Sequence, residues 1–218
     1  MPRIGTSLLA LSVAVAGTSC RTAEVNGRAP IVQPGAPGQA TRVISAEKAT
    51  DLSRVQFTPA DVRFMQGMIG HHAQALEMAA LLPERTDRED MRLLAKRIDV
   101  SQADEIKMMQ RWLEARGQDV PGPHAHHAAG APLMPGMLTP EEMARLAAAK
   151  GDAFDHLFLE LMIKHHEGAL TMVKELYATA GAGQESEMYA FASDVDADQR
   201  MEIDRMRGML MTSKEPQR

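Results

Sequence analysis

Two adjacent histidine pairs repeat along the chain with the same surroundings. The segment FMQGMIGHHAQALEMA runs from Phe64 to Ala79, and FLELMIKHHEGALTMV follows 94 residues later, from Phe158 to Val173. The chain has only eight histidines, yet each pair is flanked by methionines at matching distances. Imidazole nitrogens and thioether sulfurs both bind metal ions, so a metal site is the first chemistry that this repeat suggests.

The spacing places these side chains on helix faces. Residues three, four and seven apart share a face, so each motif forms one stripe of Met, His, Ala and Met. The stripes are Met68, His71, Ala75, Met78 and Met162, His165, Ala169, Met172. The second histidine of each pair, His72 or His166, points about 100° away. Met68 and Met162 can reach either ring of their pair, so four imidazoles and several thioethers can converge in the middle of a helical bundle.

Imidazole and thioether together favour copper. The thioether is soft and suits Cu(I), imidazole serves Cu(I) and Cu(II), and zinc sites normally use thiolate, imidazole or carboxylate. The predicted metal ligands are His71, His72, His165, His166, Met68, Met78, Met162 and Met172. Packing in an irregular helical core is the alternative role for the methionines. Whether the four histidines form one shared site or two stays open.

Carboxylates at repeated positions offer support for these histidines. Glu105 and Glu202 occupy equivalent places in the two partner helices, and Asp61 and Asp155 precede the two motifs. A buried carboxylate can bond an imidazole and fix its tautomer, either behind a bound metal or in a polar network that needs no metal. The sequence leaves both arrangements open.

A loop rich in Pro, Gly, His and Met, GQDVPGPHAHHAAGAPLMPGML, lies between the two halves at 117–138. Its composition suggests a weaker, exposed auxiliary metal site, with a solvated linker as the alternative. The candidate ligands in this loop are His124, His126, His127, Met134 and Met137.

Helix-capping residues and helix-breaking prolines and glycines predict where the helices that position these residues begin and end. Thr58, Pro59 and Asp61 supply a cap, a first-turn proline and an acid, and TPEE from Thr139 forms a capping box. We expect helices over about 58–83, 87–116, 139–151, 152–179 and 185–210. The partner helices also repeat, 97 residues apart, so the chain contains two copies of one helical hairpin. Such a repeat predicts an all-α fold, a four-helix bundle with a long His/Met-rich connection and a short extra helix.

This reading divides the chain into segments. The bundle domain covers 55–212, with a first hairpin at 55–117, a connection at 118–151 and a second hairpin at 152–212. A signal peptide at 1–20, a flexible tether at 21–54 and a tail at 213–218 complete the chain.

The N-terminus predicts export. MPRIGTSLLALSVAVAGTSC has an early arginine, an apolar run too short to span a bilayer and then small residues. Cys20, the only cysteine, resembles the lipidated cysteine of bacterial lipoproteins, and plain signal cleavage is the alternative. We therefore expect a periplasmic or cell-envelope protein that meets the membrane only through a lipid anchor at Cys20. The net charge of −5 without a basic stripe argues against a nucleic-acid partner.

The sequence lacks the motifs that are typical of several enzyme classes. The sequence contains no His-Glu-x-x-His, no Glu-x-x-His and no cysteine pair, which argues against a zinc protease and an ordinary di-iron carboxylate site. It also lacks a phosphate-cradling Gly-rich loop and a nucleophile elbow. No catalytic residue is predicted.

Three segments, MIGHHAQALEMA, FDHLFLELMIKHHEGALTMV and MPGMLTPEEMARL, resemble the bacterial family catalogued as domain of unknown function 305. The resemblance covers about Thr58 to Leu210. It implies a ferritin-like helical bundle in an exported or periplasmic protein, and some members of the family are linked to copper binding and copper tolerance. The matching positions are Met68, His71, His72, Met78, Met162, His165, His166 and Met172. The resemblance to ferritin-like bundles does not imply a di-iron site here, because the sequence lacks the Glu-x-x-His motif that such a site requires.

Three functional hypotheses follow. The first is an exported protein that sequesters copper, or hands it to an envelope copper-handling protein, through two M-I-x-H-H-x-x-A-x-x-M motifs. The second is a metal-free envelope interaction module whose histidines form a buried network with Glu105 and Glu202. The third is a copper or iron oxidoreductase, which needs an open coordination position and a substrate cleft.

Overall fold

A computed structural model describes residues 30–33, 40–50, 56–122, 125 and 133–212. The chain divides into two compact units, Met1–Asp51 and Leu52–Arg218. In the first unit, β1 (Ile31–Gln33) pairs antiparallel with β2 (Arg42–Ile44), and α1 (Ala46–Thr50) follows. These elements lie in the segment where the composition predicts a flexible tether. Strands of three residues are too short to show an apolar period.

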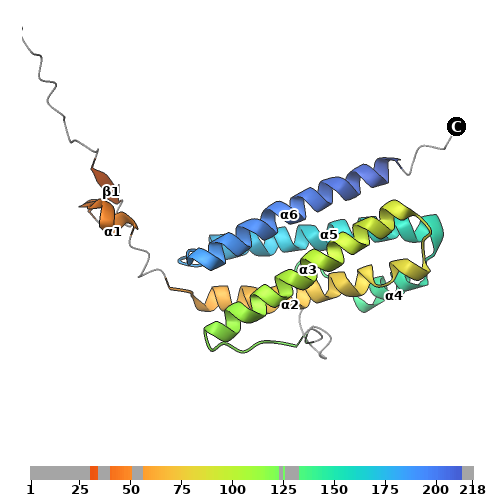
Figure 1. Cartoon of the computed structure of the whole chain (residues 1–218), viewed down its shortest axis with the longest axis horizontal. Coiled ribbons are helices and arrows are strands. Elements are labelled where there is room, and N and C mark those ends of the chain that lie inside the picture. Colours follow the sequence, from red (N-terminus) through yellow and green to blue (C-terminus); the bar gives the residue numbers. More distant parts are fainter. Residues whose placement is uncertain (1–29, 34–39, 51–55, 123–124, 126–132, 213–218) are drawn as a thin grey trace, which may run out of the picture. The chain divides into compact units, whose positions relative to one another are not determined.

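The second unit is a bundle of four long helices (Figure 1). They are α2 (Pro59–Ala79), α3 (Glu89–Ala115), α5 (Gly151–Ala178) and α6 (Ser186–Thr212). The helix α2 packs against both α3 and α5, and α5 packs against α6. The two helices that carry the histidine motifs are therefore in direct contact, and the expected all-α four-helix bundle is confirmed.

Two predicted helix starts depend on capping boxes. The Thr58 hydroxyl accepts a hydrogen bond from the Asp61 N–H, and the Asp61 carboxylate accepts one from the Thr58 N–H at 2.6 Å. Thr139 and Glu142 form the same box at the start of α4 (Pro140–Ala148). Each box satisfies backbone donors that the first turn of a helix leaves unpaired, which fixes where the helix begins.

Two predicted boundaries are wrong by a few residues. The helix α2 ends at Ala79, and a 3₁₀ turn, η1 (Leu82–Glu84), follows before α3. The helix α5 begins at Gly151 with Lys150 as its N-cap, one residue before the expected start at 152, and Asp152 is an acid of its first turn. Gly151 has a φ of 56°, a conformation that suits glycine and lets α5 follow closely after α4.

The histidine motifs lie between two apolar clusters. One cluster contains Phe64 and Met68 from before the α2 histidines and Met172 from after the α5 histidines. The other combines Met78 from after the α2 pair with Met162 from before the α5 pair. Each cluster thus combines residues that precede the histidines in one helix with residues that follow them in the other, which shows that α2 and α5 run antiparallel. Among the described helices, none is long and apolar enough to cross a bilayer.

Candidate metal centre

The two motif helices bring their first histidines together. The ring centroids of His71 and His165 lie 3.9 Å apart across the α2–α5 interface. Within each pair the centroids are 6.3 Å apart for His71 and His72, and 6.2 Å apart for His165 and His166. All four residues are at most 1% exposed. The duplicated sequence has thus built a nearly symmetric, fully buried group of imidazoles.

The second histidine of each pair turns outward to a neighbouring helix. The Nε2 atom of His72 is hydrogen-bonded to the Glu105 carboxylate on α3, and Nε2 of His166 to the Glu202 carboxylate on α6, at 2.6 Å in the latter pair. A carboxylate that accepts from Nε2 favours the tautomer with a lone pair on Nδ1. The equivalent positions of Glu105 and Glu202 in the repeat suggested these two histidine–carboxylate contacts. The group thus consists of a central pair, His71 and His165, and two outer rings that are each bonded to a carboxylate.

Several imidazole nitrogens lack hydrogen-bond partners. Among the residues that the structure describes, both ring nitrogens of His165 and the Nδ1 atoms of His72 and His166 are buried without one. Burial, and then the nearby His71, His166 and His72, lower the pKa of His165 well below its ordinary value. The ring is therefore neutral near pH 7 and offers a lone pair. Buried unpartnered polar atoms are costly, and an ion that binds them removes that cost.

Histidine and carboxylate groups alone do not complete a site. Within the described part of the chain, no three His, Cys, Asp or Glu side chains converge as a ligand group. Methionine sulfur is a donor of another kind that this part of the bundle offers. Met68 and Met162, both fully buried, each precede the first histidine of their motif by one helical turn.

The other two motif methionines lie further along the bundle. Met78 and Met172 follow His71 and His165 by seven residues, which is about 10 Å along a helix axis. Of the four predicted thioethers, Met68 and Met162 are therefore the two at the level of the histidines.

A short segment, Met134–Leu138, crosses α2 and α5 beside the histidines, and we call it the strap. Nε2 of His71 lies 3.0 Å from the Pro135 carbonyl oxygen, within hydrogen-bond distance. The Gln74 side-chain amide donates to the Leu138 carbonyl at 3.0 Å and accepts from the Leu138 N–H at 2.7 Å. The strap thus closes one side of the imidazole group and orients His71.

Two glycines permit this close approach. A Cβ added to Gly168 on α5 would lie 2.0 Å from the Pro135 oxygen. Gly136 has a φ of 76°, and a Cβ there would lie 2.6 Å from the Gly168 Cα. The roles of Gly136, Gly168 and Gln74 were not predicted from the sequence, although a glycine inside a predicted helix can indicate close packing.

The candidate ligands of the loop are only partly described. His124, His126 and His127 lie outside the described residues, as does Cys20. Met137 is 4% exposed and Met134 is partly buried, so the expectation of an exposed loop is wrong for these two. The reason is the docking of the strap on the bundle.

A surface groove of about 270 Å³ lies next to the strap. Its lining includes Phe64, Gly67, Met134, Pro135 and Met172. A Cβ added to Gly67 would lie 3.0 Å from the Met134 sulfur and 3.5 Å from the Met172 methyl group, so both thioether side chains lie over this glycine. Met134 of the strap and Met172 of α5 therefore both line this groove.

Asp61 caps the start of α2, and Asp155 on α5 lies beside Arg88, the N-cap residue of α3. The Asp61 carboxylate accepts from the Thr58 N–H and from the Gly183 N–H, the latter at 2.7 Å. An Asp155 oxygen lies 3.8 Å from Nη1 of Arg88, and burial raises the pKa of this carboxyl. Each aspartate is eleven residues before the second histidine of its motif, about 16 Å along the helix. The supporting role predicted for them is therefore wrong.

Comparison with known proteins places the chain in one class. The family model for the domain of unknown function DUF305 matches residues 61–210, and the chain belongs to this family. No curated protein matches the chain.

Solved structures agree with the family and the fold. A DUF305 protein from Streptomyces coelicolor, described as secreted, is 32% identical over 73% of this chain and 98% of that chain, with a TM-score of 0.60. A DUF305 fragment from Deinococcus radiodurans is 34% identical over 72% of this chain and 98% of that chain, with a TM-score of 0.61. CopM in its Cu(I)-bound form is 27% identical over 73% of this chain and 100% of that chain, with a TM-score of 0.56. CopM is also solved in Cu(II)-bound and Ag-bound forms.

Proposed function

We propose that this protein binds copper ions in the centre of its bundle, between α2 and α5, for sequestration or handover. The observation that carries the proposal is the contact of His71 with His165, whose ring centroids are 3.9 Å apart in a fully buried position. The lowered pKa of His165 keeps that imidazole neutral, which is the form that binds a metal ion.

The chemistry of the donors supports copper over zinc. Imidazoles from two helices can combine with the thioethers of Met68 and Met162, and thioethers favour Cu(I). Zinc sites normally use thiolate, imidazole or carboxylate ligands, so a thioether ligand would distinguish copper from zinc at this place. Glu105 and Glu202 then hold the outer imidazoles in place, as carboxylates commonly do behind metal-bound histidines.

The relatives support the same function. CopM has been solved with Cu(I), Cu(II) and Ag bound, and its 27% identity in the Cu(I)-bound form extends over 73% of this chain. We extend metal binding to this chain on that basis. Export is supported by the signal-like N-terminus and by the relative described as secreted. A lipid anchor at Cys20 and delivery to an envelope copper-handling protein complete the proposal.

A metal-free interaction module is the second candidate, and one observation favours it. The His72–Glu105 and His166–Glu202 hydrogen bonds already satisfy one nitrogen of each outer ring without any metal. In this alternative the histidines stabilise and specify the bundle core, as buried polar networks can. The two candidates differ in whether the purified protein binds copper tightly.

A competition titration tests the proposal. Cu(I), Cu(II) and Zn(II) are titrated against the full chain and a variant with alanine at His71, His72, His165 and His166. His156→Ala is the matched control, since this histidine lies on α5 with a half-exposed side chain. We expect copper to bind more tightly than zinc and the four-histidine variant, with its helicity retained by circular dichroism, to lose tight binding. Unchanged copper affinity in that variant would refute the site, and no tight binding by the wild type would favour the metal-free module.

A further inference from the structure

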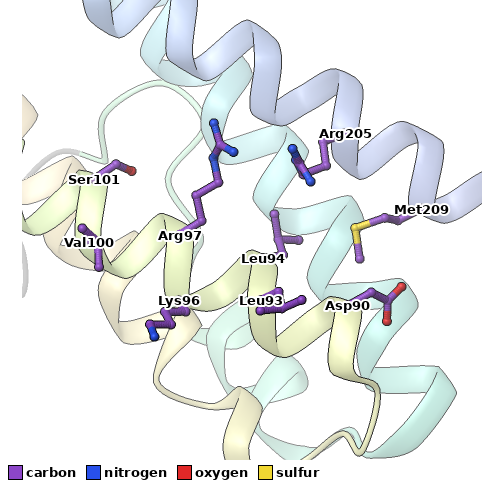
Figure 2. A pocket seen from close by; sticks show the side chains of 9 residues that line it. All are labelled: Asp90, Leu93, Leu94, Lys96, Arg97, Val100, Ser101, Arg205 and Met209. Carbon is purple, nitrogen blue, oxygen red and sulfur yellow. The ribbon is translucent and has the colours of Figure 1, made fainter.

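A second feature is a groove between α3 and α6 (Figure 2). Its volume is about 670 Å³, within the range of about 300–1,000 Å³ found for small-molecule sites. The α3 side runs from Asp90 to Ser101, which is about 16 Å along the helix, and α6 contributes Arg205 and Met209.

The floor of the groove is apolar. Leu93 and Val100 on α3 are 60% and 54% exposed, and Leu94 lies buried beneath them. Met209 adds a thioether side chain from α6. Exposed aliphatic side chains gathered in a concave surface favour an apolar ligand, since covering them removes apolar area from water.

Cationic side chains line the same groove. Figure 2 shows Arg97 from α3 and Arg205 from α6 reaching into the space between the helices, and Lys96 lies nearby. Arg205 forms no ion pair with any residue that the structure describes. Arg97 forms a long ion pair with Glu202, at 4.0 Å, and its side chain is still about half exposed. The one carboxylate of the lining, Asp90, is already paired with Arg88 at 2.6 Å.

We infer that this groove is a binding site for a small anionic amphiphile, with a carboxylate head and a single aliphatic tail. The head lies between the guanidinium groups of Arg97 and Arg205, because planar guanidinium groups bind carboxylates through paired, charge-assisted hydrogen bonds. The tail covers Leu93, Leu94 and Met209. The basic groove attracts an anion although the chain as a whole carries a net charge of −5.

Calorimetric titration of dodecanoate tests the inference. The full chain is kept metal-free with a chelator, the probe stays below its critical micelle concentration, and dodecyl maltoside serves as the neutral probe with the same tail. The test variants are Arg97→Gln/Arg205→Gln, which removes the two cations, and Leu93→Ser, which removes exposed apolar area. Arg111→Gln is the matched control, because Arg111 is an exposed arginine of α3 outside this groove.

We expect saturable binding of about one dodecanoate per chain. The double arginine variant should weaken it at least about tenfold, since two charge-assisted contacts are lost. Leu93→Ser should weaken it to a smaller extent, and Arg111→Gln should not change it. The inference is overturned if dodecanoate does not bind saturably, if the double variant binds as the wild type does, or if dodecyl maltoside binds equally well.

Discussion

His71 and His165, 94 residues apart in sequence, place their imidazole rings 3.9 Å apart at an angle of 37° in the centre of the bundle. Two protonated rings at this separation would repel each other, and burial already disfavours a charge on His165. Neutral rings can instead offer the in-plane lone pairs of their nitrogens to a cation. Several measurable consequences depend on this contact and on the residues that hold it.

The stability of the metal-free chain should fall as the pH drops from 8 to 5.5. The pKa of His165 lies well below its unfolded value of about 6.5, so between the two values the unfolded chain binds a proton that the folded chain excludes. The folded chain therefore keeps its full stability, as far as His165 is concerned, above about pH 6.5, and loses stability progressively below that pH. Thermal unfolding at a series of pH values, with His165→Gln as the comparison, checks this. A midpoint that stays constant or rises on acidification would contradict the assignment, as would an identical slope in the variant.

Gly168→Ala should displace the strap. The new Cβ would lie 2.0 Å from the Pro135 oxygen, which belongs to the backbone and must move. We expect a loss of about 1–3 kcal/mol in the free energy of unfolding, as for other overpacked sites, and weaker copper binding through the lost orientation of His71. Gly208→Ala is the control, because nothing lies within 4 Å of its added Cβ. Denaturant unfolding should show the control as stable as the wild type or more so, and equal stability of Gly168→Ala would show that the strap is not docked.

Glu202→Gln should weaken copper binding without unfolding the protein. The substitution keeps the shape of the side chain and removes the charge that accepts from His166. Loss of such a carboxylate typically lowers metal affinity about 10- to 100-fold. Glu167→Gln is the matched control, since Glu167 is the next residue to His166 but pairs on the surface with Arg207 at 2.8 Å. If both variants bound copper as tightly as the wild type, Glu202 would have no part in the site.

Asp61→Ala should lower stability and leave copper affinity unchanged. It removes the α2 capping box and the hydrogen bond from the Gly183 N–H, so we expect a cost of about 1–2 kcal/mol. Chemical denaturation gives the stability, and a copper titration on the folded variant gives the affinity. If the folded Asp61→Ala protein bound copper much more weakly than the wild type, Asp61 would support the metal site after all.

Much of the fold could be predicted because its signals are local. The repeated Asp–Phe–Met–His–His spacing and the capping boxes at Thr58 and Thr139 indicate where α2 and α4 begin and that the chain holds two equivalent hairpins. The start of α5 was missed by one residue, since a glycine with positive φ at Gly151 lets the helix follow α4 without a side-chain cap.

The site was harder to predict because its contacts are long-range. Helical periodicity showed that His71 and His72 point in different directions, but only the antiparallel packing of α2 on α5 shows that His71 meets His165. The Pro135 carbonyl carries no side-chain signal, so its contact with His71 is not readable from the sequence. Asp61 and Asp155 were misassigned because a matching repeat position shows equivalence and not distance from the histidines.

X-ray absorption at the copper edge of the Cu(I)-loaded full chain, at one equivalent, tests the central claim most directly. A site formed by the bundle histidines and the buried thioethers of Met68 and Met162 predicts both nitrogen and sulfur in the first shell. In the variant Met68→Leu/Met162→Leu, which keeps similar volume in the core, the sulfur contribution should disappear while nitrogen remains. A first shell of nitrogen and oxygen alone in the wild type, or an unchanged spectrum in the variant, would contradict the proposed site.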